Sequence, residues 1–245
     1  MSAVILAGGE GKRMKSDKPK ALSEVLNKPM LRWVIDSVKG AGIDNVCVVT
    51  GFKREYIEEY LHTLPFDTET AYQPQRLGTG HAVMMCREFL RKNEGDVVVL
   101  NGDAPFMDSE TVKEAYRLHK ESNSSATVIS AKVDDPFGYG RIVRDADGAI
   151  KAIVEQKDAS KEEQSINEVN SGGYWFNTES LLGVLDEITA NNAGGEYYLT
   201  DAVSILLNKG KTVCAYTAQS SNTVLGANDP EQLKRLNEIA RAKEQ

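Results

Sequence analysis

Long apolar runs and cysteine are both scarce in this 245-residue sequence. No apolar run approaches the roughly 20 residues needed to cross a membrane, and the first residues have no basic stretch before a short apolar segment, so no secretory signal is predicted. The three cysteines, Cys47, Cys86 and Cys214, are widely spaced and cannot all pair. Cys47 and Cys214 lie in apolar, strand-like runs, which favours buried thiols over disulfides. We therefore expect a cytoplasmic protein with no membrane association.

Positive charge is also not in excess. The formal net charge is −7, with 41% hydrophobic and 27% charged residues. A general binder of nucleic acid needs an exposed basic face, so no nucleic-acid partner is predicted. Cations gathered inside one cleft remain compatible with this balance. The length allows one large or two small domains.

Common catalytic and metal-binding patterns are missing as well. His62, His81 and His119 do not have the spacing of metal ligands, and we interpret them as surface or loop residues. No Ser–His–Asp or Cys–His arrangement can be assembled. The sequence contains no internal repeat and no low-complexity tract.

Short β-branched runs alternate with helical patterns in the first half of the chain. This alternation is typical of parallel strands joined by helical crossovers, and it predicts a doubly wound, mostly parallel α/β sheet. The predicted strands are 3–7, 45–50, 69–72, 96–100 and 126–133, and the predicted helices are 30–41, 53–64, 79–91 and 109–122.

The pattern changes after residue 133. Asp147-Gly148 lies between two apolar runs, 138–143 and 149–154, and is the strongest hairpin signal in the sequence. We predict a polar excursion at 157–164, a strand at 169–176, helices at 180–188 and 199–207, a strand at 213–216 and a charged amphipathic helix at 230–243. The second half is therefore expected to form a small subregion that contains a β-hairpin.

A glycine-rich loop follows the first predicted strand. Gly8, Gly9 and Gly11 allow successive backbone N–H groups to turn toward an anion, and Arg13 and Lys20 could hold more than one phosphate. The loop lacks the Ser or Thr of a Walker A motif. It also lacks the third glycine of the dinucleotide fingerprint, which disfavours an NAD-binding oxidoreductase. A nucleotide loop of another type is favoured, with a purely structural turn as the alternative.

Two further loops are expected at the same edge of the sheet, because ligands bind beyond the carboxyl ends of parallel strands. In the loop 73–80, Gln73 could read a base edge with its amide, and Gly78 could let backbone approach a flat base. In the loop 101–105, Asp103 follows a buried strand and is a hard oxygen ligand suited to Mg²⁺. A structural turn and a helix cap are the respective alternatives, and spacing alone does not identify a second metal ligand.

The motifs, taken together, resemble those of a known family. The segment 6–14 with Lys20 is similar to the LxxGxGxRM…PK signature of sugar-phosphate nucleotidyltransferases. The full ordered set resembles the uridylyltransferase domain of the bacterial bifunctional N-acetylglucosamine-1-phosphate uridylyltransferases, which make a cell wall precursor. The further motifs are Gln73, Leu77–Ala82, Gly138–Ile142, Ile153–Ala159, Asn170, Glu196–Asp201 and Asn228.

This resemblance implies a reaction and a role for each matching residue. UTP and N-acetylglucosamine 1-phosphate would be the substrates, and Mg²⁺ the cofactor. Arg13 and Lys20 would be catalytic and bind the triphosphate, and Asp103 and Asn228 would hold the metal. The substrate-binding residues would be Leu6, Ala7, Gly8, Gly9, Gln73, Gly78, Thr79, Asn101 and Gly102 on the nucleotide side, and Gly140, Glu155, Asn170 and Thr200 on the sugar side.

The resemblance also implies a domain division. Residues 1–229 would form the nucleotidyltransferase domain, with a nucleotide half at about 1–125 and a sugar-binding half at about 126–229, and 230–245 would be a linker-type helix. The family's acetyltransferase half has no counterpart in this sequence, so acetyl transfer is not predicted, and the oligomeric state is left open.

Two departures and two alternatives accompany this reading. Asn101 stands where the family usually has an aromatic residue, and the segment after Asn170 differs slightly from the usual Asn-Thr-Gly. A related enzyme that uses another sugar 1-phosphate or another nucleotide is one alternative. A non-catalytic sugar-nucleotide sensor on the same fold is the other, but such a protein would be expected to have lost a cation or the metal carboxylate.

Overall fold

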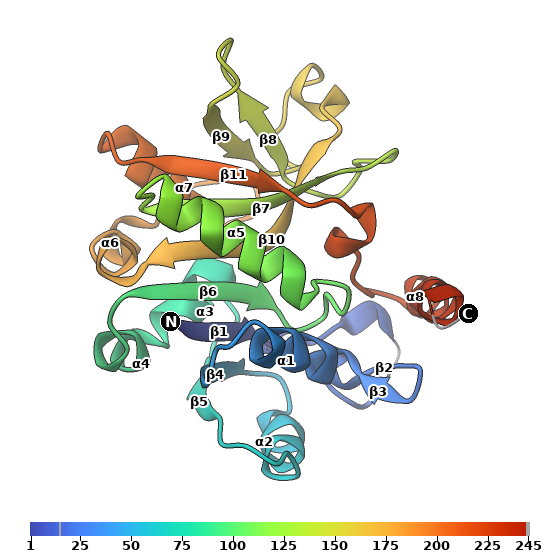
Figure 1. Ribbon diagram of the computed structural model, residues 1–245. Coiled ribbons are helices and arrows are strands. Elements are labelled where there is room, and N and C mark those ends of the chain that lie inside the picture. Colours follow the sequence, from blue (N-terminus) through green and yellow to red (C-terminus); the bar gives the residue numbers. More distant parts are fainter. Residues whose placement is uncertain (15, 244–245) are drawn as a thin grey trace.

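A mixed β-sheet runs through the centre of the molecule (Figure 1). The computed structural model describes residues 1–14 and 16–243. Within them, the main path of the nine-stranded sheet has the order β11-β7-β10-β6-β1-β4-β5. Its strands are β1 (Ser2–Leu6), β4 (Asn45–Thr50), β5 (Glu69–Tyr72), β6 (Asp96–Asn101), β7 (Ala126–Lys132), β10 (Glu168–Asn177) and β11 (Val213–Thr217).

One strand of this path runs against the others. β1 pairs in parallel with β4 and β6, β4 with β5, and β7 with β11, whereas β10 is antiparallel to both β6 and β7. The predicted mostly parallel α/β sheet is confirmed. Because the parallel strands share one direction, the loops after Leu6 and Asn101 leave the sheet at the same edge. The sequence analysis predicts a ligand-binding site at this edge.

Helices cover both faces of the sheet. One face packs against α1 (Met30–Gly40), α2 (Arg54–His62) and α5 (Ser109–Glu121), and the other against α3 (Thr79–Met84), α4 (Arg87–Lys92), α6 (Thr178–Leu182) and α7 (Thr200–Asn208). The central strands are buried on both faces. This burial explains why their sequences are continuous apolar runs without alternation.

The predicted helix over 79–91 is wrong in one respect, because the structure divides it into α3 and α4. At Cys86 the N–H bonds to the carbonyl of Val83, three residues back, which tightens the turn between the two helices. Ala82, Val83, Cys86 and Leu90 all stay buried through this turn. The break therefore preserves the apolar face, and no Pro or Gly marks it in the sequence.

The remaining differences also fall on short elements. The helix predicted over 180–188 is α6, followed by a 3₁₀ turn at Leu185–Glu187, and the polar excursion at 157–164 leads into a 3₁₀ turn at Glu163–Ser165. The sequence analysis did not predict the small sheet of β2 (Glu24–Val25) and β3 (Lys28–Pro29). Two-residue strands leave no periodic signal, so these could not be found from patterning.

The interpretation of His119 as a surface or loop residue is wrong. This histidine lies on α5 with 1% of its surface exposed. Its Nδ1 is 3.0 Å from Thr127 Oγ1 and its Nε2 is 3.5 Å from Asp96 Oδ1. Burial lowers the pKa of His119. His119 thus connects α5 to β7 and β6 through buried contacts with Thr127 and Asp96.

The predicted hairpin forms from β8 (Arg141–Arg144) and β9 (Ile150–Val154). Asp145 Oδ1 accepts from the N–H groups of Asp147 and Ala149, and Gly148 has a φ of +83°. This turn chemistry is what the Asp-Gly pair indicates. β8 also pairs with β10, where Arg141 lies opposite Val169, and Figure 1 shows the hairpin at the top of the molecule, above β11 and β7.

The last helix, α8 (Pro230–Lys243), packs against β2 and buries Leu236 and Ala240.

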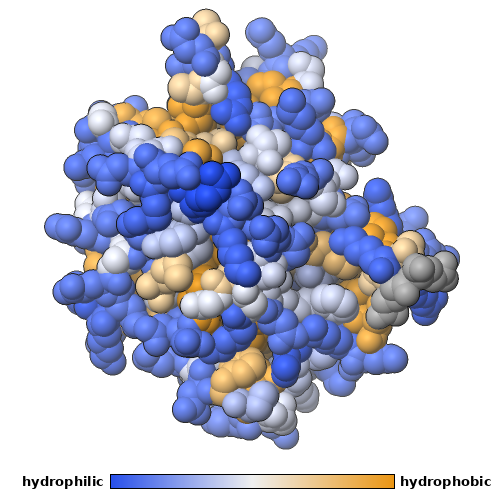
Figure 2. Space-filling view, in the orientation of Figure 1, coloured by the Kyte–Doolittle hydropathy of each residue, from blue (hydrophilic) through white to orange (hydrophobic). Residues whose placement is uncertain are grey.

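The surface of the face seen in Figure 1 is mostly hydrophilic, with small and separated apolar areas (Figure 2). Among the described residues, no helix combines the length and the apolar character that crossing a bilayer would require.

Glu168 joins the hairpin to the main sheet. Its carboxylate accepts from Arg144 Nε at 2.8 Å and Nη2 at 2.7 Å, and from Ser130 Oγ at 2.7 Å. Burial opposes the charged form of Glu168, but the hydrogen bonds from Arg144 and Ser130 outweigh this effect and lower its pKa. The ionised carboxylate therefore stabilises the fold.

We expect Glu168→Gln to lower the free energy of unfolding by about 2 kcal/mol at neutral pH, since it removes charge-assisted hydrogen bonds. A folded-state pKa below the unfolded value of about 4.3 adds stability above that pH, and this stability is lost as the pH falls through the folded pKa. The difference between wild type and variant should thus shrink in acid. Urea denaturation at pH 7 and in the acid range measures it.

The matched control is Glu162→Gln on the exposed polar segment nearby. This variant should change the free energy of unfolding by no more than a few tenths of a kcal/mol. A Glu168→Gln variant as stable as wild type at pH 7 would contradict a stabilising role for the ion pair.

Candidate functional site

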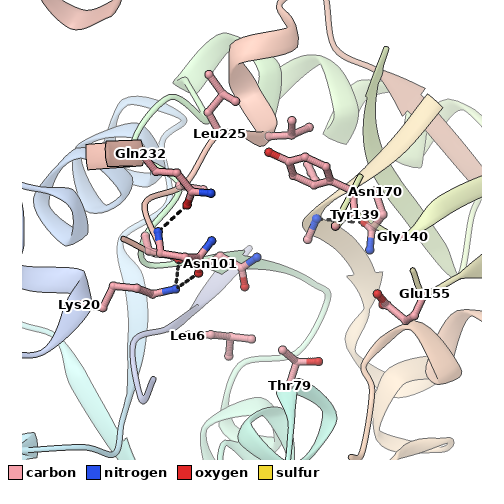
Figure 3. A pocket seen from close by; sticks show the side chains of 18 of the residues that line it. Leu6, Lys20, Thr79, Asn101, Tyr139, Gly140, Glu155, Asn170, Leu225 and Gln232 are labelled. Carbon is pink, nitrogen blue, oxygen red and sulfur yellow. Dashed lines mark hydrogen bonds and ion pairs between the residues drawn. The ribbon is translucent and has the colours of Figure 1, made fainter. Parts of the chain in front are cut away.

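Two adjoining cavities open at the carboxyl edge of the sheet. The larger has a volume of about 550 Å³ and the smaller about 220 Å³. The residues that line both cavities are Leu6, Lys20, Thr79, Asn101 and Asp103. In the larger cavity, Lys20 and Gln232 lie on one side, and Gly140, Glu155 and Asn170 lie on the opposite side (Figure 3). Two ligands, one in each cavity, would therefore lie next to each other at this shared wall.

The smaller cavity is formed by the glycine-rich loop and the loop after β5. It is lined by the residues predicted for the nucleotide, among them Ala7, Gly8, Gly9, Gln73 and Gly78. Gly78 has a φ of +117°, and a Cβ there would lie 2.5 Å from the carbonyl oxygen of Tyr197. Only glycine fits this close approach. The requirement for glycine at this position therefore comes from packing against Tyr197, as expected of the structural turn that was the alternative.

Thr79 connects this cavity to α7. It begins α3, and its Oγ1 accepts from the N–H of Leu199 at 3.0 Å. Gly102 is the predicted binding residue that lines neither cavity. Its N–H donates to the carbonyl of Leu6 at 2.9 Å, so Gly102 holds the ends of β1 and β6 together beneath the site.

Lys20, Asp103 and Asn228 meet at the wall between the cavities. The Lys20 ammonium forms an ion pair with Asp103 and donates to Asn228 Oδ1 at 2.9 Å. These side chains come from a 3₁₀ turn (Lys20–Leu22), the loop after β6 and the segment before α8. Each of Lys20 and Asp103 has about a fifth of its side chain exposed. The structure brings the predicted catalytic lysine and both predicted metal ligands together.

The oxygen atoms of Asp103 and Asn228 fit a magnesium site. Mg²⁺ is usually held by one or two carboxylates together with substrate phosphates and water, so a dense carboxylate cluster is not required. Among the described residues no group of three or more His, Cys, Asp or Glu side chains could hold a metal. Asp103 and Asn228 thus offer one carboxylate and one amide oxygen as metal donors.

Gln232 is a site residue that the sequence analysis missed. Its Oε1 accepts from the N–H of Asn228 at 2.8 Å, while its own N–H donates to Asp229 Oδ1 at 2.8 Å. Asp229, Pro230 and Gln232 form the start of α8, with the spacing of a helix cap. The sequence analysis could have recognised this spacing of Asp229, Pro230 and Gln232 as the start of a helix. The first turn of α8 therefore holds Asn228 in place, and Arg235 and Leu236 of the same helix also line the larger cavity.

The opposite side of the larger cavity carries the residues predicted for the sugar. The N–H of Asn170 donates to the carbonyl of Gly140 at 2.8 Å, and Thr200 Oγ1 donates to Glu155 Oε1 at 3.3 Å. Burial raises the pKa of the Glu155 carboxyl, against the effect of the Thr200 hydrogen bond. Four residues predicted from separate motifs thus face one cavity.

Asn170 is oriented by groups that the sequence analysis did not include. Its Nδ2 donates to the Tyr174 hydroxyl at 2.6 Å, and its Oδ1 accepts from the N–H of Gly172 at 3.0 Å. These contacts lie at an irregularity of β10 between Asn170 and Gly173. Burial raises the pKa of Tyr174, so its hydroxyl stays neutral and can both accept and donate.

Arg13 and Phe137 lie at the rim. Arg13 is exposed in a 3₁₀ turn (Lys12–Met14) and lines the larger cavity. Phe137, which the sequence analysis did not single out, lines the same cavity with 77% of its surface exposed. Four residues further along the chain, the buried Arg141 donates to the carbonyl of Tyr139 and to Gln156 Oε1, which also accepts from the N–H of Gly138. Arg141 thus fixes the loop that carries Gly140.

Curated relatives are similar to this chain in sequence, and solved structures are similar to it in fold. The chain is 48% identical over 243 residues to the protein named Bifunctional protein GlmU from Acetivibrio thermocellus, covering 99% of this chain and 52% of the relative. It is 46% identical to the protein of the same name from Clostridium beijerinckii, covering 97% and 51%. The chain thus spans about half the length of these relatives.

A solved structure, the UDP-glucose pyrophosphorylase complexed with UDP-glucose, aligns with a TM-score of 0.81 at 17% identity, covering 99% of this chain and 98% of that chain. At this identity the likeness supports the fold. The sequence pattern of the family described as Nucleotidyl transferase matches residues 2–222. This match covers most of the sequence, and the chain belongs to the nucleotidyl transferase family.

Proposed function

We propose that this protein transfers a uridylyl group from UTP to N-acetylglucosamine 1-phosphate, giving UDP-N-acetylglucosamine and pyrophosphate, and that it does so in the cytoplasm. The observation that carries the proposal is the pair of cavities with a shared wall at Lys20 and Asp103. Family membership supports nucleotidyl transfer. The relatives named Bifunctional protein GlmU support the choice of substrates, in line with the motif resemblance.

The proposed chemistry is an in-line displacement at phosphorus. An oxygen of the sugar 1-phosphate forms a bond to the α-phosphorus of UTP, the bond from that phosphorus to the bridging oxygen breaks, and pyrophosphate leaves. The attacking oxygen is already anionic, so no general base is required. The site's task is to bring two anions together and to stabilise charge as it spreads.

Cations of this chain carry that task in the proposal. Lys20 lies where the two cavities meet, and Arg13 lines the larger one, so both could contact phosphate oxygens. Asp103 and Asn228 would hold Mg²⁺, which would supply neutralisation of negative charge on the phosphates. The ammonium of Lys20 now pairs with both of these residues. The same two residues thus hold the Lys20 ammonium at the wall between the cavities.

The sugar would occupy the opposite side of the larger cavity. Glu155 offers carboxylate oxygens, and Asn170 has one amide hydrogen beyond the one donated to Tyr174. An N-acetylamino sugar presents hydroxyl donors and an amide, and these groups complement such a set. Gly140 contributes backbone without a side chain, which leaves room for the ring.

The reaction itself can be tested with a panel that crosses four nucleoside triphosphates with several sugar 1-phosphates, with and without Mg²⁺. Pyrophosphate release should be fastest with UTP and N-acetylglucosamine 1-phosphate and should require the metal. Faster turnover with another pair would reassign the substrates within the family. Tight binding of UDP-N-acetylglucosamine without any turnover would support a sensor and overturn the enzymatic proposal.

The assigned residues can be tested by Asp103→Asn and Lys20→Ala. Each removes a charge from the wall between the cavities, and each should lower kcat on the order of a hundred- to a thousandfold, as for removal of one preorganised charge-stabilising donor. Lys18→Ala, an exposed lysine of the same segment that lines neither cavity, is the matched control and should keep near-normal kcat. Near-normal pyrophosphate release by both site variants would refute their assignment.

A further inference from the structure

The orientation of the Gln73 side chain is fixed by acceptors on one side. Its Nε2 donates to the carbonyl oxygen of Gly78 at 3.0 Å and lies 3.1 Å from His81 Nδ1. A backbone carbonyl can only accept, so the amide NH₂ group must face Gly78 and His81. His81 Nδ1 must then accept the second amide hydrogen, which places the ring proton on Nε2. Gln73 is buried, so few other orientations are open to it.

The carboxamide oxygen of Gln73 is consequently turned toward the glycine-rich loop. A Cβ placed at Gly8 would lie 3.0 Å from Gln73 Oε1. Gly8, Gln73 and Gly78 all line the smaller cavity. Within residues 1–14 and 16–243, the N–H groups of Gly8 and Gly78 donate to no backbone carbonyl. One fixed acceptor, Gln73 Oε1, thus lies at the wall of this cavity, and the two glycines could add backbone N–H donors beside it.

This set has a definite complement among nucleobases. Uracil and thymine present a ring N–H flanked by two carbonyl oxygens, which matches an acceptor accompanied by donors. Cytosine presents an unprotonated ring nitrogen in that position, and it would face the lone pairs of Gln73 Oε1. If the Gln73 amide were reversed, its NH₂ group would match cytosine instead. The direction of this one amide therefore decides which pyrimidine fits.

We propose that His81 is a specificity-determining positioning residue, which holds the Gln73 amide so that its oxygen faces the base and selects uracil-type over cytosine-type nucleotides. This proposal rests on the proposed function, in which the smaller cavity takes a pyrimidine nucleotide. His81 itself lines neither cavity and acts through Gln73. Its ring is 6.3 Å from that of Tyr197, whose N–H and carbonyl bond to Leu77 and Gly80. The histidine is thereby braced against the same loop.

The test compares wild type with His81→Leu and His81→Asn. Leucine removes the acceptor, and we expect the ratio of kcat/KM for UTP to that for CTP to fall about tenfold, the effect of one neutral hydrogen bond. Asparagine can place its Oδ1 near the position of Nδ1 and should keep most of the ratio. The KM for the sugar 1-phosphate should not change in either variant, since the sugar side of the larger cavity is untouched.

Several outcomes would overturn the proposal. They are a wild type that uses UTP and CTP equally, a folded His81→Leu variant with an unchanged ratio, and an asparagine variant that loses the ratio as leucine does. If wild type binds UTP in preference to CTP by calorimetry but shows no turnover, the proposed function fails while base selection is still measured in the same variants. Nitrogen-15 NMR of the free protein provides an independent check, because a proton on Nδ1 of His81 would contradict the acceptor role.

Discussion

The ion pair between Lys20 and Asp103, extended by the hydrogen bond from Lys20 to Asn228, connects three segments that are far apart in the sequence. Lys20 follows the glycine-rich loop, Asp103 follows β6, and Asn228 precedes α8. Because each charged side chain is only about a fifth exposed, neither could be left there alone without a large desolvation cost. The ion pair at the wall between the two cavities therefore requires the segments of Lys20 and Asp103, and Asn228 adds a third segment to this contact.

The reversed strand β10 gives the site its second side. A wholly parallel sheet would place the loop after β10 at the same edge as those after β1 and β6. Running in the opposite direction, β10 instead brings its first residues, including Asn170, to that edge. The hairpin of β8 and β9 joins β10 there, and Arg144 and Glu168 fasten it to the sheet. The direction of β10 thus adds a second wall to the cleft at this edge of the sheet.

Local chemistry made much of the fold predictable, and distance in the sequence set the limit. A continuous apolar run located β4 with the observed bounds, and Asp147-Gly148 located the hairpin turn. Spacing could not connect Asp103 with Asn228, because nothing local relates residues so far apart, and only the family resemblance supplied that pair. The burial of His119 was readable, since Val112, Ala115 and His119 fall on one face of α5. The break between α3 and α4 was not, because no Pro or Gly marks it in the sequence.

At the start of α8, the residues that begin the helix also support the site. Gln232 caps the N–H of Asn228, and Asp229 caps the N–H of Gln232, so the helix cap and the support of the site are one hydrogen-bond arrangement. A helix that merely followed the domain would need only the cap. This one also buries Leu236 and Ala240 against β2 and the loop regions near Met14 and Phe106. Packing along the helix therefore fixes its first turn, the first turn fixes Asn228, and Asn228 completes the polar wall with Lys20 and Asp103.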